Sequence, residues 1–121
     1  MKNILVAEDE EKLAEFYVKF LTKNGYNVEV VRNANETLER LHKGDKKFDL
    51  LITDMNMPEW DGACSVIGAG VIDKDLKIII VSGYLHNPDY EFVMNVASNI
   101  SAVIPKPFDP DVLLQEIKKI I

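Results

Sequence analysis

Five short apolar runs, separated by segments of helical pattern, restrict the fold of this chain more than any other feature of its sequence. The runs begin near residues 3, 26, 49, 77 and 101, and each has the length of a strand. They are continuously apolar, which is typical of parallel strands buried on both faces of a sheet. The alternation predicts an α/β fold with five strands, a doubly wound (βα)5 parallel sheet of strand order 2-1-3-4-5.

The segments between the runs carry helix signals. Residues 11–25 place apolar side chains at three-and-four spacing and end on glycine, and residues 33–44 repeat this design. The pairs Asn87-Pro88 and Asp109-Pro110 each read as a helix cap followed by a first-turn proline. Four helices are therefore predicted from local signals, the last of them running to the end of the chain.

A further helix over residues 63–73 is predicted from context only. Gly68 and Gly70 lie inside it, and each costs about 1 kcal/mol relative to alanine in a helix interior. The alternation of strands and helices nevertheless requires a crossover there. We also expect Cys64 in this segment to be a small packed residue.

The composition fits a single globular domain over residues 1–121, with 47% apolar and 28% charged residues. No apolar stretch is long enough for a membrane span, and the amino terminus lacks the apolar region of a signal peptide, which together predict a cytoplasmic protein. One cysteine and two histidines leave no spacing for a disulfide or a structural zinc site. A net charge of −6 argues against direct binding of nucleic acid.

The strands end on residues that can carry chemistry. The first ends on Glu8-Asp9, the third on Asp54, the fourth on Ser82 and the fifth on Lys106. In a doubly wound sheet these ends meet at one edge, where ligands bind. Three carboxylates at close range require a cation, and oxygen ligands with open positions suit Mg²⁺ or Mn²⁺. A lysine and a hydroxyl beside them would complete a cradle for a phosphoryl group, with the central carboxylate as nucleophile.

These residues lie in four ordered motifs, ILVAEDE, DMNMPEWDG, IIIVSG and PKPF, which span the chain. In this order they resemble the receiver domain of two-component response regulators, the CheY-like family. The resemblance implies a flavodoxin-like fold. It also implies that Asp54 accepts a phosphoryl group from a sensor histidine kinase or a histidine phosphotransfer protein.

The same resemblance implies the roles of the other site residues. Asp9, Asp54 and the backbone carbonyl of Asn56 would hold Mg²⁺, and Glu8 would reach it through water. Ser82 and Lys106 would contact the phosphoryl oxygens. The resemblance also implies a cis Lys106-Pro107 peptide bond, which is frequent in the family. Such a domain is not an enzyme beyond catalysing its own phosphorylation and dephosphorylation.

One departure from the family concerns the switch. Many receivers carry an aromatic residue three positions before the lysine, where this chain has Val103. Tyr84 is therefore hypothesised to serve as the mobile aromatic. The chain would be either a stand-alone receiver or one cut from a longer protein. By analogy with known receivers, a stand-alone receiver would dock a downstream protein on its fourth-helix, fifth-strand, fifth-helix surface, roughly residues 88 to 121.

Two alternative functions remain open. A phosphorylation-independent interaction module would have the same fold, although it would be expected to lack the acceptor or the lysine. A small Mg²⁺-dependent phosphatase of the haloacid-dehalogenase kind also uses an aspartate after a parallel strand. The stretch Asp54-Met55-Asn56, however, lacks the second aspartate that such enzymes use as acid and base.

Overall fold

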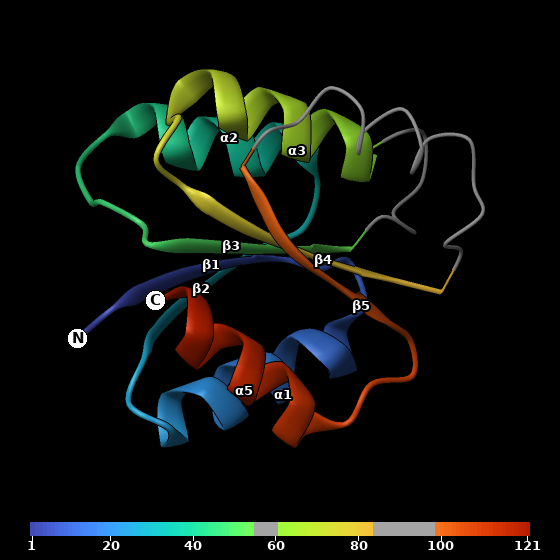
Figure 1. Cartoon of the computed structure of the whole chain (residues 1–121). Coiled ribbons are helices and arrows are strands. Elements are labelled where there is room, and N and C mark those ends of the chain that lie inside the picture. Colours follow the sequence, from blue (N-terminus) through green and yellow to red (C-terminus); the bar gives the residue numbers. More distant parts are fainter. Residues whose placement is uncertain (55–60, 84–98) are drawn as a thin grey trace.

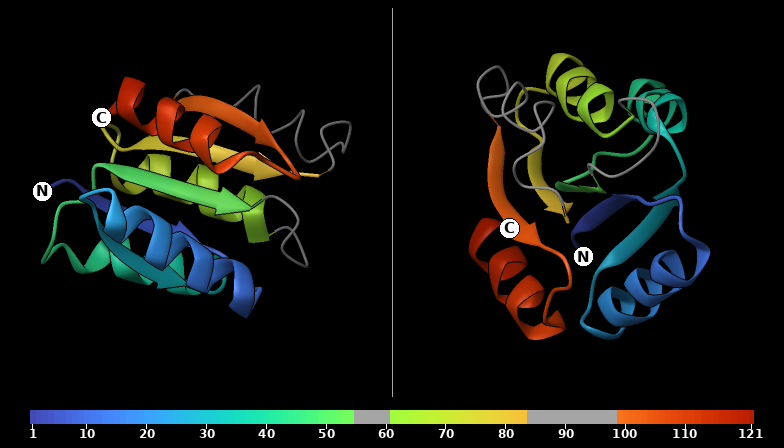
Figure 2. Two further views of the ribbon diagram at one scale, coloured as in Figure 1. Left: turned by 90° about the horizontal axis from the view of Figure 1, so that it is seen from below. Right: turned by 90° about the vertical axis from the view of Figure 1, so that its right-hand side faces the viewer.

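The computed structural model of the chain describes residues 1–54, 61–83 and 99–121, with the side chains of residues 61–63 left out. Five strands form one parallel sheet in the order β2-β1-β3-β4-β5, as the sequence predicts. Figure 2 shows the strand arrows running in one direction. The strands are β1 (Asn3–Ala7), β2 (Asn27–Val31), β3 (Leu50–Asp54), β4 (Lys77–Ser82) and β5 (Ile100–Pro105).

The helices cover the sheet on both faces. Helices α1 and α5 lie on one face, and α2 and α3 lie on the other (Figure 1). Their bounds are α1 (Glu11–Lys23), α2 (Ala34–Lys43), α3 (Asp61–Ile72) and α5 (Pro110–Ile120). The helix predicted to begin at Asn87-Pro88 lies outside the described residues. No helix in the described part of the chain is long and apolar enough to span a membrane.

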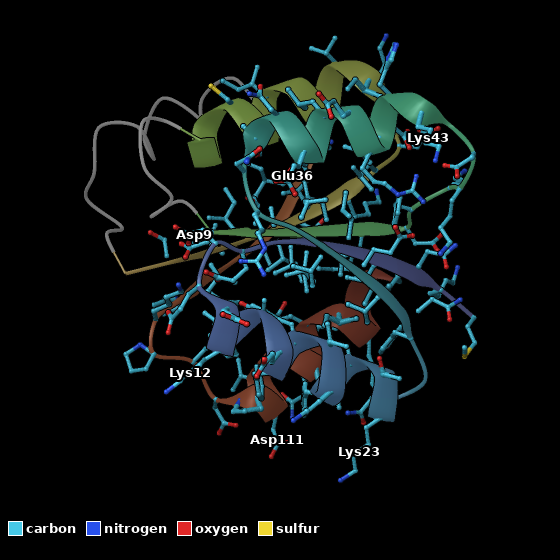
Figure 3. All side chains as sticks on the ribbon, turned by 180° about the vertical axis from the view of Figure 1, so that it is seen from behind. Asp9, Lys12, Lys23, Glu36, Lys43 and Asp111 are labelled. Carbon is cyan, nitrogen blue, oxygen red and sulfur yellow. The ribbon has the colours of Figure 1, made fainter. Side chains whose placement is uncertain are left out.

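Two apolar layers form the core, one on each face of the sheet. Because successive strand residues point to opposite faces, the central strands contribute to both layers. The layer beneath α2 and α3 contains Leu5, Leu51, Val66, Ala69, Ile78 and Ile80. The layer above α1 and α5 contains Ile4, Val6, Tyr17, Leu21, Leu50, Ile52, Ile79, Val81, Leu113 and Ile117. Lys12, Lys23 and Asp111 point away from the sheet on the α1/α5 side (Figure 3).

Helix α2 shows how local sequence sets an element's bounds. Asn33 caps the helix by accepting a hydrogen bond from the Glu36 backbone N–H at 2.8 Å, and the Glu36 carboxylate accepts from the backbone N–H of Arg32 at 3.2 Å. This reciprocal arrangement satisfies donors that the first helical turn leaves unpaired. The helix ends at Gly44, whose φ of 69° is the left-handed conformation that glycine adopts without a steric penalty.

Helix α3 confirms the prediction that rested on context. Its Gly68 has a packing role, because a Cβ built there would lie 2.6 Å from a Leu38 methyl group of α2. The missing side chain thus lets the two helices approach. The expectation that Cys64 is packed was wrong: Cys64 is exposed, because Ser65, Val66 and Ala69 form the buried face of the helix instead.

The outer strand β2 is held by charged side chains. Glu29 accepts hydrogen bonds from Arg40 Nε at 2.8 Å and from Lys46 Nζ at 3.0 Å. The Arg40 guanidinium also lies over the Phe48 ring, 5.0 Å from its centroid. These contacts tie α2 and the segment before β3 to the sheet edge. On the opposite edge, β5 ends with Pro105, a residue that only an edge strand accommodates readily.

Candidate functional site: an acidic cluster with a lysine

The candidate site lies at the carboxyl ends of β1, β3, β4 and β5. Parallel register aligns these ends: Ala7 pairs with Thr53, Asp54 with Val81 and Ser82 with Pro105. The strands are short and parallel, and their pairing is regular up to these ends, so the residues at and after the ends emerge together at one edge. The predicted convergence of Glu8, Asp9, Asp54, Ser82 and Lys106 is therefore a direct result of strand order and register.

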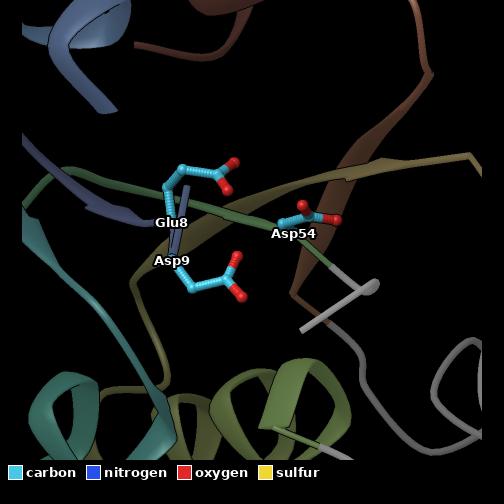
Figure 4. Close-up of side chains that lie close together, drawn as sticks. All are labelled: Glu8, Asp9 and Asp54. Carbon is cyan, nitrogen blue, oxygen red and sulfur yellow. The ribbon is translucent and has the colours of Figure 1, made fainter. Parts of the chain in front are cut away.

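Strand alternation decides to which side each carboxylate turns. In β3, Leu50 and Ile52 point into the α1/α5 layer, and Asp54 continues that series. In β1, Ile4 and Val6 also point into the α1/α5 layer, and Glu8, the next residue of that alternation, turns to the same side. Figure 4 shows the side chains of Glu8 and Asp9 extending to opposite sides of the chain, with Asp54 at the neighbouring strand end.

The three carboxylates form a compact cluster. One oxygen from each of Glu8, Asp9 and Asp54 lies within 4.8 Å of the others. Glu8 is 1% exposed and Asp54 4%, whereas Asp9 is open to solvent. Hard oxygen ligands with one exposed side fit a divalent cation that keeps part of its water shell. The residues present therefore fit Mg²⁺ or Mn²⁺.

Lys106 enters the cluster from the end of β5. Its Nζ lies 2.5 Å from Oδ2 of Asp54 and 3.8 Å from Oε1 of Glu8. The Lys106 side chain is 23% exposed, so water screens its charge less than that of a surface lysine. Its charge offsets part of the repulsion between the two buried carboxylates. The Lys106–Pro107 peptide bond is cis, as the resemblance implied.

Glu8 has the most perturbed ionisation in the cluster. Burial, which disfavours the charged form, raises the pKa of Glu8 to about 7. The backbone N–H of Glu10 and the charge of Lys106 act in the opposite direction, and the charge of Asp54 adds to the rise. Glu8 Oε2 accepts that N–H at 3.1 Å, but Oε1 has no hydrogen-bond partner among the described residues. Buried acceptors in folded proteins normally have a partner, so Oε1 is available to a bound cation, a water molecule or a hydrogen-bond donor that is not among the described residues.

Ser82 and Lys106 are joined through their backbones. Ser82 is the last residue of β4 and is fully buried. Its carbonyl oxygen accepts a hydrogen bond from the Lys106 backbone N–H at 2.9 Å. This bond extends the β4–β5 pairing by one residue and holds the start of the lysine loop beside Ser82.

Two residues that the sequence analysis named, Asn56 and Tyr84, lie outside the described residues. Val103 is half-buried and packs against the layer beneath α2 and α3. It therefore lies in the layer opposite to the one into which Asp54 points.

Tyr17 is a buried polar side chain of the α1/α5 layer whose relation to the site the sequence did not indicate. It was assigned only to the apolar stripe of the first predicted helix. Tyr17 is 1% exposed, and burial, with a smaller effect of the charges of Glu8 and Asp54, raises the pKa of its phenol. The only available signal was a hydroxyl-bearing residue in an otherwise apolar stripe, which is not specific.

The comparisons with known proteins agree with this geometry. The family model of the response regulator receiver domain matches residues 4–118. The response regulator receiver protein CpdR of Brucella abortus (strain 2308) is 40% identical over 124 residues, covering 100% of this chain and 98% of CpdR. The sensor kinase CckA of the same organism is 29% identical over 119 residues, but the chain spans only 12% of its length.

Two solved structures show the same fold. A CheY-like receiver domain protein from Methanospirillum hungatei superposes with a TM-score of 0.88 at 28% identity, covering 98% of this chain and 92% of that one. The response regulator TrrA from Thermotoga maritima, solved in complex with Mg(2+)-BeF, superposes with a TM-score of 0.83 at 29% identity. That match covers 100% of both chains.

Proposed function

Because this chain belongs to the response regulator receiver domain family of two-component systems, we propose that it accepts a phosphoryl group on Asp54. The observation that carries the proposal is the ion pair of Asp54 with Lys106 beside two further carboxylates. A lysine from one strand end and an acidic cluster from two others form a site for both an anion and a cation. Phosphoryl transfer requires both.

The proposed reaction moves one phosphoryl group from a phosphohistidine to Asp54. An Oδ atom of Asp54 attacks phosphorus, and the P–N bond breaks as the P–O bond forms. The donor histidine retains the electron pair of the broken bond and takes up a proton. The signal would end when water attacks the same phosphorus and hydrolyses the acyl phosphate, which releases inorganic phosphate and restores the Asp54 carboxylate. The domain therefore acts on no separate substrate. It is a signalling domain that catalyses only its own phosphorylation and dephosphorylation.

Lys106 and Ser82 would hold the transferred group. The Lys106 ammonium already lies against Asp54, so it would offset negative charge as the phosphoryl group arrives. The hydroxyl of Ser82, at the adjacent strand end, would donate a hydrogen bond to a phosphoryl oxygen. Both donors come from paired strand ends, so they would be in place before the reaction.

Asp9, Asp54 and the backbone carbonyl of Asn56 would hold Mg²⁺ or Mn²⁺, with Glu8 reaching the ion through water. When bound, the cation supplies positive charge that offsets the phosphoryl oxygens and the clustered carboxylates. The Oε1 atom of buried Glu8, which has no hydrogen-bond partner among the described residues, supports this assignment.

The proposed partners follow from the family. The donor would be a sensor histidine kinase or a histidine phosphotransfer protein. The output would be a downstream protein docking on residues 88 to 121, of which β5 and α5 are described. The net charge of −6 supports a protein rather than a nucleic acid as the direct partner. The cytoplasmic location that the sequence predicts is part of this proposal.

Intact mass spectrometry after addition of acetyl phosphate tests the proposal. We expect wild-type protein with Mg²⁺ to gain the mass of one phosphoryl group, and protein with EDTA or the Asp54→Asn variant to gain none. Asp75→Asn, which changes an exposed aspartate away from the strand ends, is the matched control and should gain the group normally. A mass gain in Asp54→Asn would assign the acceptor elsewhere. No gain in folded wild type with Mg²⁺ would favour the phosphorylation-independent interaction module.

A further inference from the structure

Tyr17 is a buried polar side chain that the proposed mechanism does not use. It lies on the inner face of α1 and is 1% exposed. Its ring is stacked on that of Phe108, with centroids 5.9 Å apart, and is tilted against that of Phe16 at 5.8 Å. These two ring contacts restrict the orientation of the phenol.

This aromatic packing connects α1 to the loop that carries Lys106. Phe108 follows Lys106 by two residues, and its ring contacts both Phe16 and Tyr17 of α1. Tyr17 therefore lies in the same layer as the lysine loop. The carboxylates of Glu8 and Asp54 turn into this α1/α5 layer by strand alternation.

The Tyr17 phenol keeps its proton in this environment. Burial, with the negative charges of Glu8 and Asp54, raises the pKa of Tyr17. A neutral hydroxyl is a hydrogen-bond donor at every pH at which the site would operate. The layer thus contains a fixed donor and, at Glu8 Oε1, a buried acceptor without a hydrogen-bond partner in the described structure.

We propose that Tyr17 is a positioning residue, whose hydroxyl is linked to the Glu8 carboxylate through one bridging water molecule. This link would orient Glu8 toward the cation, so Tyr17 would act on Mg²⁺ affinity and not on the transferred group itself. This inference rests on the proposed function, because it assigns Glu8 to the Mg²⁺ site.

Tyr17→Phe tests the inference, because it removes the hydroxyl and keeps the ring. Calorimetric titration of the unphosphorylated variant with Mg²⁺ should give a Kd about tenfold above that of wild type, the lower end of the range for residues that orient metal ligands. The matched control is Tyr26→Phe, since Tyr26 precedes β2 at the opposite end of the strands. It should leave the Kd unchanged.

Phosphorylation by acetyl phosphate gives a second readout. With Tyr17→Phe, we expect half-maximal rate at about tenfold higher Mg²⁺ concentration, and a wild-type rate at saturating Mg²⁺. A merely structural defect would lower the rate at every Mg²⁺ concentration, and that result would overturn the inference. An unchanged Kd would also overturn it.

The two failures are distinguishable. If wild type gains a phosphoryl group on Asp54 while Tyr17→Phe binds Mg²⁺ normally, only the role of Tyr17 is wrong. If wild type neither binds Mg²⁺ nor gains the group, the proposed function fails, and the inference fails with it.

Discussion

The backbone N–H of Lys106 donates a hydrogen bond to the carbonyl oxygen of Ser82, so main-chain pairing holds together two residues proposed to contact the phosphoryl group. Neither side chain takes part in this bond. Substitution of either side chain should therefore change the chemistry of the site and leave the pairing of β4 with β5 intact. This separation makes the site suitable for testing by single substitutions.

Lys106→Met should impair both phosphorylation and stability. It leaves the buried carboxylates of Glu8 and Asp54 without their shared cation, and we expect a loss of about 2 kcal/mol in Mg²⁺-free buffer. Added Mg²⁺ should restore part of that loss. Urea unfolding with and without Mg²⁺ measures both effects. Lys119→Met, in an exposed ion pair, is the control and should change stability by less than about 0.5 kcal/mol. Equal losses in the two variants would contradict the prediction.

Asp9→Asn should remove the stabilisation that Mg²⁺ gives to the folded state. At a Mg²⁺ concentration 100 times the Kd, wild type should gain about 2.7 kcal/mol by mass action. The variant lacks one of three clustered carboxylates and should gain much less, although without Mg²⁺ it should be slightly more stable because repulsion is reduced. Thermal unfolding at several Mg²⁺ concentrations measures this, with Glu15→Gln on the exposed side of α1 as control. An undiminished Mg²⁺ response in Asp9→Asn would remove Asp9 from the proposed ligands.

The free energy of unfolding should fall at acidic pH, partly because Glu29 becomes protonated. The hydrogen bond from Arg40 is the main cause that lowers the pKa of Glu29 from 4.5 to about 2, and Lys46 adds to it. The unfolded chain therefore binds a proton at higher pH than the folded chain. Stability from this group is complete above about pH 5 and is lost as the pH falls toward 2.

The expected contribution of Glu29 is about 1 kcal/mol, because its side chain is 35% exposed and water screens the pair. Comparing wild type with Glu29→Gln by urea unfolding at pH 6 and pH 3 measures it. The difference between the two proteins should shrink at the lower pH. A constant difference would show that the carboxylate charge is not responsible.

The effect of Gly68→Ala on the free energy of unfolding should depend on the side chain of Leu38. Alanine in α3 favours the helix by about 1 kcal/mol, but its Cβ would lie 2.6 Å from a Leu38 methyl group, so the leucine side chain must turn away. In a Leu38→Ala background the same substitution should be more favourable by about 1 kcal/mol. A double-mutant cycle in urea measures this coupling. Additive effects would show that Leu38 moves without cost.

The sequence predicts the sheet well because its signals are local. Continuous apolar runs give the parallel strands, and Asn33 and Gly44 give the ends of α2. The order of strands then follows from right-handed crossovers. The carboxylates and Lys106 were predicted together because each of them ends a strand or closely follows one, and parallel strands of one sheet end at the same edge.

The features that the sequence did not predict depend on packing between distant segments. Gly68 looks unfavourable to a helix until Leu38 of α2 is placed beside it. Cys64 was expected to be packed because cysteine is usually buried, but the helix turns it outward. Tyr17 resembled any other core residue in the sequence, since only the folded structure shows that its ring stacks on Phe108, next to the loop that carries Lys106.

Glu8 and Asp9 are consecutive residues that extend to opposite sides of the chain (Figure 4). Glu8 follows the strand face packed against α1 and α5, whereas Asp9 turns the other way. A cation held by both residues would therefore link the two sides of the sheet, each of which has its own apolar layer.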